Sequence, residues 1–206
     1  MRHWWLALSL AFLGQSAWAG DAVKVDQSDP QQMIIGLSTS VLAELKARVD
    51  ELEANPGVLR EFTQLNVLPY VDSMRMARHI AGRYWRTATP QQQEDFVEQF
   101  TLTILRTYSQ SLHKLDVARI DVAAPLPDGD NRVIVPTRVL RENGATADVS
   151  YRIFKERDSG NWLIYDVIVE GVSLLLNFRQ SYASEIERKG LDQVIEDMKA
   201  NNKMFL

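Results

Sequence analysis

The spacing of apolar residues changes near the middle of this chain, at Leu115. From Asp29 to about residue 113, apolar side chains recur every three or four residues, which is typical of amphipathic helices. From 115 to 172 they alternate with polar residues between turn-forming stretches, which predicts β-strands. Helical spacing returns over 173–200. Helices, then strands, then helices favour an α+β fold rather than one in which the two alternate.

Turn signals divide the alternating segment into about four strands, predicted at 115–124, 131–141, 146–156 and 162–170. The turns between the last three strands are short, as in antiparallel hairpins. We therefore expect helices packed on a curved antiparallel sheet.

Several residues predict where helices start and stop. Asp29-Pro30 and Thr89-Pro90 each place a capping side chain before a proline suited to the first helical turn. Pro56-Gly57 ends the first long helix, and Gly190 interrupts the last helical stretch. The sequence thus predicts a helical subdomain over 56–113, a sheet over 115–172 and C-terminal helices over 173–200.

The first 19 residues have the features of a cleavable secretory signal peptide. A basic start precedes an apolar run over 4–13, and Ala17 and Ala19 flank the expected cleavage site. We expect 20–206 to form a single domain with no membrane span. The chain has no cysteine, so it offers no disulfide, no thiolate metal site and no lipid anchor on cysteine. The expected location is the periplasm, with secretion as the alternative.

The sequence contains little recognisable catalytic chemistry. His79 and His113 both lack the partner three or four residues away that a helical metal site would need. No phosphate-binding loop or dinucleotide fingerprint is present. A net charge of −4 argues against a nucleic-acid partner. We therefore expect no catalytic residues, no metal and no cofactor.

The predicted strand register concentrates apolar residues on one face of the sheet. A turn centred on 143–144 pairs Pro136 with Tyr151. The next turn allows Ile153 to pair with Tyr165 or with a neighbour one residue away, and the hydrophobic match favours Tyr165. One face then carries Ile134, Pro136, Leu140, Val149, Tyr151, Ile153, Leu163, Tyr165, Val167 and Val169, interrupted by Arg138. The other face is mixed and places Arg152 opposite Asp166 as a predicted ion pair. The apolar face can either fill a core or line a cavity, and periodicity alone does not separate the two.

A series of short motifs resembles the MlaC, or toluene-tolerance, family of periplasmic phospholipid carriers. The resemblance spans most of the predicted mature chain, and the motifs occur in the expected order. They are VLPYVD at 67–72, MA at 76–77, GRYW at 82–85, Pro90, Phe96, Phe100, LRTY at 105–108, GNW at 160–162, YDV at 165–167, EGVSL at 170–174, NFR at 177–179 and GLD at 190–192.

The resemblance implies a fold like that of nuclear transport factor 2 with a helical subdomain, and a deep pocket for the acyl tails of a glycerophospholipid. It also implies that a monomer shuttles lipid between an outer-membrane lipoprotein–porin complex and an inner-membrane ABC transporter complex, maintaining outer-membrane lipid asymmetry. We predict that the tails contact the apolar sheet face and one helix. The predicted lipid-binding residues are Leu105, Tyr108, Val149, Tyr151, Ile153, Tyr165, Val167 and Val169.

Two other hypotheses remain open from the residues alone. An enzyme on a similar cone-shaped fold would need an ionisable residue on the apolar face, where the predicted register offers only Arg138. An interaction or chaperone module without bound lipid would have a filled core. A carrier, by contrast, must enclose its cargo, because exposing a tail of roughly 16 carbons to water costs on the order of 12 kcal/mol.

Overall fold

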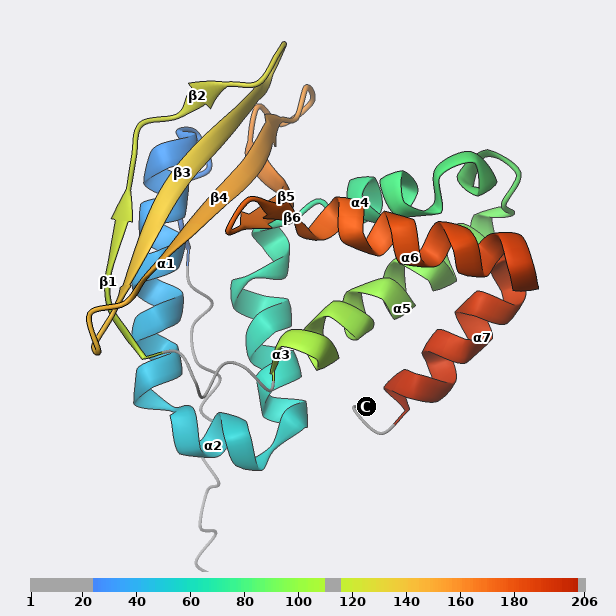
Figure 1. Cartoon of the computed structure of the whole chain (residues 1–206), viewed down its shortest axis with the longest axis horizontal. Helices are drawn as coiled ribbons and strands as arrows, with labels where there is room; N and C mark the ends of the chain where they lie inside the picture. The colour runs from blue at the N-terminus through green and yellow to red at the C-terminus, as the bar shows by residue number, and fades with distance from the viewer. Residues whose placement is uncertain (1–23, 110–115, 204–206) are drawn as a thin grey trace, which may run out of the picture.

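The computed structural model describes residues 24–109 and 116–203. The predicted signal peptide and His113 lie outside the described residues. Two groups of elements lie next to each other in Figure 1: a twisted sheet with one long helix packed on it, and a cluster of helices beside one edge of the sheet. The α+β fold with a helical subdomain is therefore confirmed.

The helices occur in the predicted order but contain more breaks. Asp29 caps the first of them, accepting a hydrogen bond from the Gln32 N–H at 2.8 Å, as expected. Arg48 interrupts the predicted first helix, and Gly82, at a φ of +56°, ends the helix that begins at Ser73, after which a 3₁₀ turn follows. The bounds are α1 (Pro30–Ala47), α2 (Val49–Ala54), α3 (Pro56–Asn66), η1 (Leu68–Tyr70), α4 (Ser73–Ala81), η2 (Gly82–Arg86), α5 (Pro90–Ser109), α6 (Leu174–Lys189) and α7 (Leu191–Asn202).

The sheet is antiparallel, as predicted, and has six strands rather than about four because two strands of two residues each extend it. The strands follow the order β1-β3-β4-β5-β6, and β2 pairs with β3 beyond the end of β1. The bounds are β1 (Val117–Val122), β2 (Leu126–Pro127), β3 (Arg132–Arg141), β4 (Thr146–Lys155), β5 (Trp162–Val169) and β6 (Val172–Ser173).

The predicted register between β3 and β4 is wrong by one residue. Tyr151 pairs with Val135, and Pro136 pairs with Ser150. The Arg141 N–H donates to the Ala145 carbonyl, so the loop holds three residues, and Gly144 takes the positive φ of +84° that closes such a loop. The predicted register assumes a two-residue turn instead. The slip exchanges the two faces of β3, so Val133 and Val135, not Ile134 and Pro136, share a face with Tyr151.

Between β4 and β5 the predicted register is partly confirmed. Val149 pairs with Val169, Tyr151 with Val167 and Arg152 with Asp166, as expected. The register then shifts, and Ile153 pairs with Ile164 instead of Tyr165. A β-bulge accommodates one extra residue here. Tyr165 therefore packs on the helical side, against the Phe154 ring with 6.2 Å between the ring centroids.

Two main hydrophobic cores follow from this arrangement. The first lies between the sheet and α1, where Met33, Ile34 and Leu37 pack with Val135, Ile153 and Ile164. The second lies among α4, η2, α5, α6 and α7, and includes Phe96 and Phe100. A smaller cluster of Leu52, Leu59 and Phe62 joins α2 and α3 beside α1.

The extended segment before α1 is built into the fold. The Val25 N–H donates to the Tyr70 hydroxyl at 2.8 Å, and the Trp162 N–H donates to the Gln27 carbonyl at 2.9 Å. Gly36 makes room for this crossing, because a Cβ there would lie 2.6 Å from Cγ1 of Val25. Residues 25–27 therefore connect α1, η1 and the start of β5.

Candidate functional site

An apolar cavity of about 240 Å³ lies where the helical cluster meets the β5 edge of the sheet. Its walls come from α3, η1, α4, α5, β5 and the start of α6. Val71 forms an isolated bridge with Ile164, and the Asp72 N–H donates to the Ile164 carbonyl at 2.9 Å. These contacts fix the start of α4 on β5, so the cavity has a rigid wall on that side.

The side chains that line the cavity are mainly aliphatic and aromatic. Phe100 and Ile164 are 1% and 7% exposed, whereas Tyr108 is 37% exposed and marks the edge of the cavity at the end of α5. Burial raises the pKa of Tyr108, so its hydroxyl stays protonated at neutral pH. Apart from the buried Asp166 carboxylate, the cavity therefore presents an uncharged and mainly apolar surface.

Three of the polar side chains in the wall, those of Thr63, Thr101 and Asp166, already bond to the protein itself. The Thr63 and Thr101 hydroxyls donate to the carbonyls of Leu59 and Val97, each one turn earlier in its own helix. Asp166, which is fully buried, accepts from the Ser173 hydroxyl at 2.6 Å and from the Leu175 N–H at 3.0 Å. These groups are thus structural and leave little polar capacity for a ligand.

The predicted ion pair between Arg152 and Asp166 is present at 3.9 Å, and Arg152 also lies 3.6 Å from Asp128. Asp128 in turn accepts a hydrogen bond of 3.3 Å from the Tyr165 hydroxyl. This network occupies the sheet face opposite Val167. It holds Asp166 between the sheet and the start of α6.

Three of the predicted lipid-binding residues, Leu105, Tyr108 and Val167, come together in the cavity wall. Ile153 is fully buried in the core under α1, and Tyr151 packs against the same core. Tyr165, Val149 and Val169 are not among the lining residues either. Tyr165 is displaced by the bulge, while Val149 and Val169 form a pair farther along β4 and β5.

Other lining residues were not predicted as site residues. Phe100 and Ile104 share one side of the α5 helix, a pattern equally typical of a plain core. The predicted register placed Ile164 on the mixed face, because nothing in the local sequence marked the bulge. Val67 and Leu68 precede Pro69 in a segment whose position depends entirely on tertiary packing.

The described residues contain neither a metal-binding cluster nor a membrane-spanning helix. Across 24–109 and 116–203, no group of three or more histidines or acidic residues could hold a metal ion. None of the helices in the same ranges is both long and apolar enough to cross a membrane.

Comparison with known proteins gives consistent matches. The chain is 29% identical over 170 residues to the toluene tolerance protein Ttg2D of Pseudomonas putida, covering 81% of this chain and 78% of that protein. It is 22% identical over 200 residues to the intermembrane phospholipid transport system binding protein MlaC of Haemophilus influenzae, covering 96% and 92% respectively.

A solved structure has the same fold. It is the phospholipid-binding protein from Ralstonia solanacearum in complex with a phospholipid, with a TM-score of 0.77 and 24% identity, covering 86% of this chain and 98% of that one. The family model described as MlaC protein matches residues 36–200. The chain therefore belongs to the MlaC family.

Proposed function

We propose that this protein is a non-catalytic carrier that binds a glycerophospholipid by its acyl tails. The observation that carries the proposal is the apolar cavity, whose buried carboxylate and threonine hydroxyls are satisfied by the protein itself. The names of the relatives from Haemophilus influenzae and Ralstonia solanacearum, which refer to phospholipid transport and phospholipid binding, point in the same direction.

The physical case rests on hydration. Each methylene moved from water to an apolar site gains about 0.8 kcal/mol, so a tail is held without any specific polar contact. A carrier of this kind needs shape and dryness rather than a chemical motif. Leu105, Tyr108 and Val167 are proposed to contact the tails.

The cavity must widen to accept a whole lipid. Pockets that enclose a drug-sized ligand have volumes of about 300–1,000 Å³, and this cavity measures about 240 Å³. We assign the movement to α3, because it packs on α2 through its own small cluster while Thr63 forms part of the cavity wall.

Spin labels test this movement directly, since a chain without cysteine gives no background labelling. Labels at Leu65 on α3 and Thr107 on α5 use exposed positions outside the cavity lining. The distance between them should increase when phospholipid is loaded. An unchanged distance in a lipid-loaded sample would exclude α3 as the moving wall.

We further propose that residues 1–19 direct export and that the mature protein works in the periplasm. Its exchange partners would be an inner-membrane ABC transporter complex and an outer-membrane lipoprotein–porin complex. The sequence contains no phosphate-binding loop, so energy for uphill transfer would come from a partner. N-terminal sequencing of periplasmic material should start at Gly20, and a purified sample should not hydrolyse ATP.

Solvent extraction followed by lipid mass spectrometry tests the cavity. Val167→Trp and Leu105→Trp fill the cavity without adding charge, and each should lower the phospholipid load of the folded protein. Val149→Trp is the matched control, because Val149 lies on a neighbouring strand but does not line the cavity. A normal load in both cavity variants would contradict the proposal. A missing load in the wild-type protein would favour an interaction module without lipid.

A further inference from the structure

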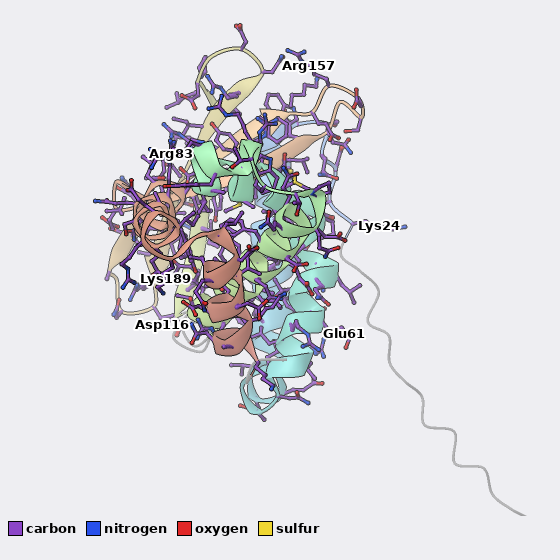
Figure 2. The ribbon with its side chains drawn as sticks, turned by 90° about the vertical axis from the view of Figure 1, so that its right-hand side faces the viewer. Lys24, Glu61, Arg83, Asp116, Arg157 and Lys189 are labelled. Atoms are coloured by element: carbon purple, nitrogen blue, oxygen red, sulfur yellow. The ribbon has the colours of Figure 1, made fainter. Side chains whose placement is uncertain are left out.

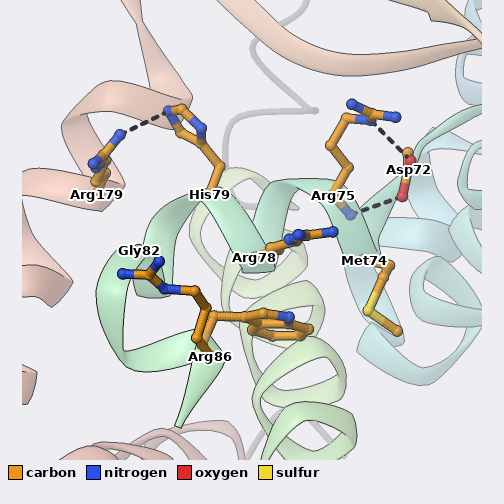
Figure 3. Close-up of a pocket in the computed structure, with 9 residues that line it drawn as sticks. Asp72, Met74, Arg75, Arg78, His79, Gly82, Arg86 and Arg179 are labelled. Carbon is orange, nitrogen blue, oxygen red and sulfur yellow. Dashed lines mark hydrogen bonds and ion pairs between the residues drawn. The ribbon is translucent and has the colours of Figure 1, made fainter. Parts of the chain in front are cut away.

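A second hollow of about 460 Å³ lies on the outer side of α4 and has the opposite chemistry. Four arginines line it, Arg75 and Arg78 from α4, Arg86 from η2 and Arg179 from α6, together with His79. We call it the basic pocket. Figure 3 shows that these side chains come from separate elements and surround one space. The only acidic residue in the lining is Asp72.

The basic pocket concentrates positive charge in an acidic protein. Its four arginines and one aspartate give a net charge of +3, whereas the whole chain carries −4. Charges of one sign within a concave wall reinforce each other's potential and attract counter-charged groups. The pocket is separate from the apolar cavity, because the two share no lining residue.

Two of the four arginines are held in place by neighbours. Arg75 pairs with Asp72 at 3.2 Å and stacks on the Phe154 ring, 3.6 Å from its centroid. Arg179 lies 3.2 Å from Nε2 of His79. The Arg179 guanidinium can only donate, so Nε2 accepts and the histidine ring is neutral in this contact.

The other two arginines are available to a ligand. Within 24–109 and 116–203, the guanidinium groups of Arg78 and Arg86 make no hydrogen bond or ion pair, and both side chains are exposed. A guanidinium group carries five N–H donors in a planar fork that matches phosphate or carboxylate oxygens. Donors that approach from three elements suit a tetrahedral anion better than a flat carboxylate, which offers only two oxygens.

Exposed apolar side chains beside the basic pocket indicate that the anion belongs to a lipid surface. Met74 lines the pocket and is 53% exposed. Leu176, also 53% exposed, stands three residues before Arg179 and so on the same side of α6. Basic residues next to exposed apolar ones are typical of surfaces that rest on anionic lipid.

We propose that the basic pocket binds a phosphate group, as carried by phospholipid headgroups at a membrane surface. Bound phosphate would accept hydrogen bonds from Arg78 and Arg86, with Arg75 and Arg179 adding charge. The inference goes beyond lipid carriage, because the site lies outside the cavity and requires no lipid inside it.

The first test uses inorganic phosphate as the probe. Amide NMR spectra of the purified protein, recorded at constant ionic strength against chloride, should shift around Arg78, Arg86 and Arg179. The double variant Arg78→Gln/Arg86→Gln should bind phosphate about tenfold more weakly or worse, since each change removes a charge-assisted donor. Arg157→Gln is the control for the loss of an arginine charge outside the pocket, because Arg157 lies on the turn between β4 and β5, labelled in Figure 2.

The second test identifies the source of the phosphate. Vesicles rich in phosphatidylglycerol should sediment the wild-type protein and release the double variant, while phosphatidylcholine vesicles should bind neither strongly. Phosphate binding without vesicle binding would assign the site to the free ion and overturn the membrane part of the proposal. An acidic peptide that binds when phosphate does not would overturn it entirely, as would unchanged binding in the double variant.

The lipid content of the same variants keeps the two proposals separable. Arg78→Gln/Arg86→Gln should retain the normal phospholipid load, because neither residue lines the apolar cavity. Absence of lipid from every sample would count against the carrier proposal. The phosphate-binding test would still be valid, because it does not depend on lipid in the cavity.

Discussion

The same face of the sheet is filled under α1 and open at its β5 edge. Under α1, Met33 and Ile34 cover Val135 and Ile153, and all four side chains are at most 1% exposed. At the edge, Val167 is only partly buried and borders the cavity. Both regions consist of alternating apolar residues, so the strand pattern predicts that this face is shielded from water but does not distinguish a filled core from a cavity. What covers each region is decided by helices that lie far away in the sequence.

The largest expected difference between the two regions is in stability. Ile153→Ala should reduce the free energy of unfolding by about 2–5 kcal/mol, because it leaves a void in a closely packed core. Val167→Ala should cost clearly less, since its side chain already borders empty space. Urea unfolding of lipid-free protein measures both, and equal losses would mean that the two regions are packed alike.

The boundary between the regions should depend on Asp166. Asp166→Ala removes the acceptor for the Ser173 hydroxyl and the Leu175 N–H, and such hydrogen bonds to a charged group contribute about 1.5–3 kcal/mol. Asp148→Ala is the control, because its ion pair with Arg138 is exposed and should contribute far less. If both variants unfold at the same urea concentration, Asp166 does not connect the sheet to α6.

A smaller effect is expected at Ile164, which belongs to both the α1 core and the cavity wall. Ile164→Val should cost about 0.5–1.5 kcal/mol in lipid-free protein, and a bound tail should recover part of this loss by filling the space. Ile153→Val removes the same methylene where no ligand can reach. Thermal unfolding with and without lipid should therefore separate the two variants, and an identical response would place Ile164 in the filled region.

The smallest expected effect is on the pKa of His79, which lies on the outer surface and responds to the buried charge of Asp166. Partial burial and the positive charges of Arg179 and Arg152 lower the pKa of His79, while the Asp166 carboxylate opposes them. Asp166→Asn removes that opposing charge, so the pKa of His79 should fall further. Arg179→Gln should move it in the other direction. NMR titration of the histidine ring measures both changes, and a shift of the same sign in the two variants would contradict the assignment.

Local sequence predicted the elements but only part of their pairing. Asp29 capping α1 and Gly190 ending α6 were recognisable because caps depend on adjacent residues. The β4–β5 pairing of Tyr151 with Val167 followed from a hydrophobic match. The three-residue loop at Gly144 and the bulge at Tyr165 each shift the strand register by one residue. A shift of one residue moves the side chains to the opposite face of the sheet, so both had a large effect on the predicted pairing.

The candidate site was harder to predict for the same reason. Val167 could be placed because its side of β5 followed from local pairing, whereas Ile153 and Val167 could not be told apart by pattern. Ile153 is buried because α1 packs over it, whereas Val167 borders the cavity that α3, η1 and α5 line. Such coverage is set by long-range packing, which single-strand periodicity does not contain.

The bond between Gln27 and Trp162 joins residues 135 positions apart, and contacts of that separation form late because loop closure costs entropy. If the chain is exported N-terminus first, residues 25–27 cross the membrane long before β5 does. They would remain extended and accessible beside the proposed cleavage site after Ala19. Once β5 has been translocated and folds, the same residues are packed against α1 and held to η1 and β5 by their hydrogen bonds. The fold would thereby set the order of events in biogenesis, with processing ahead of closure.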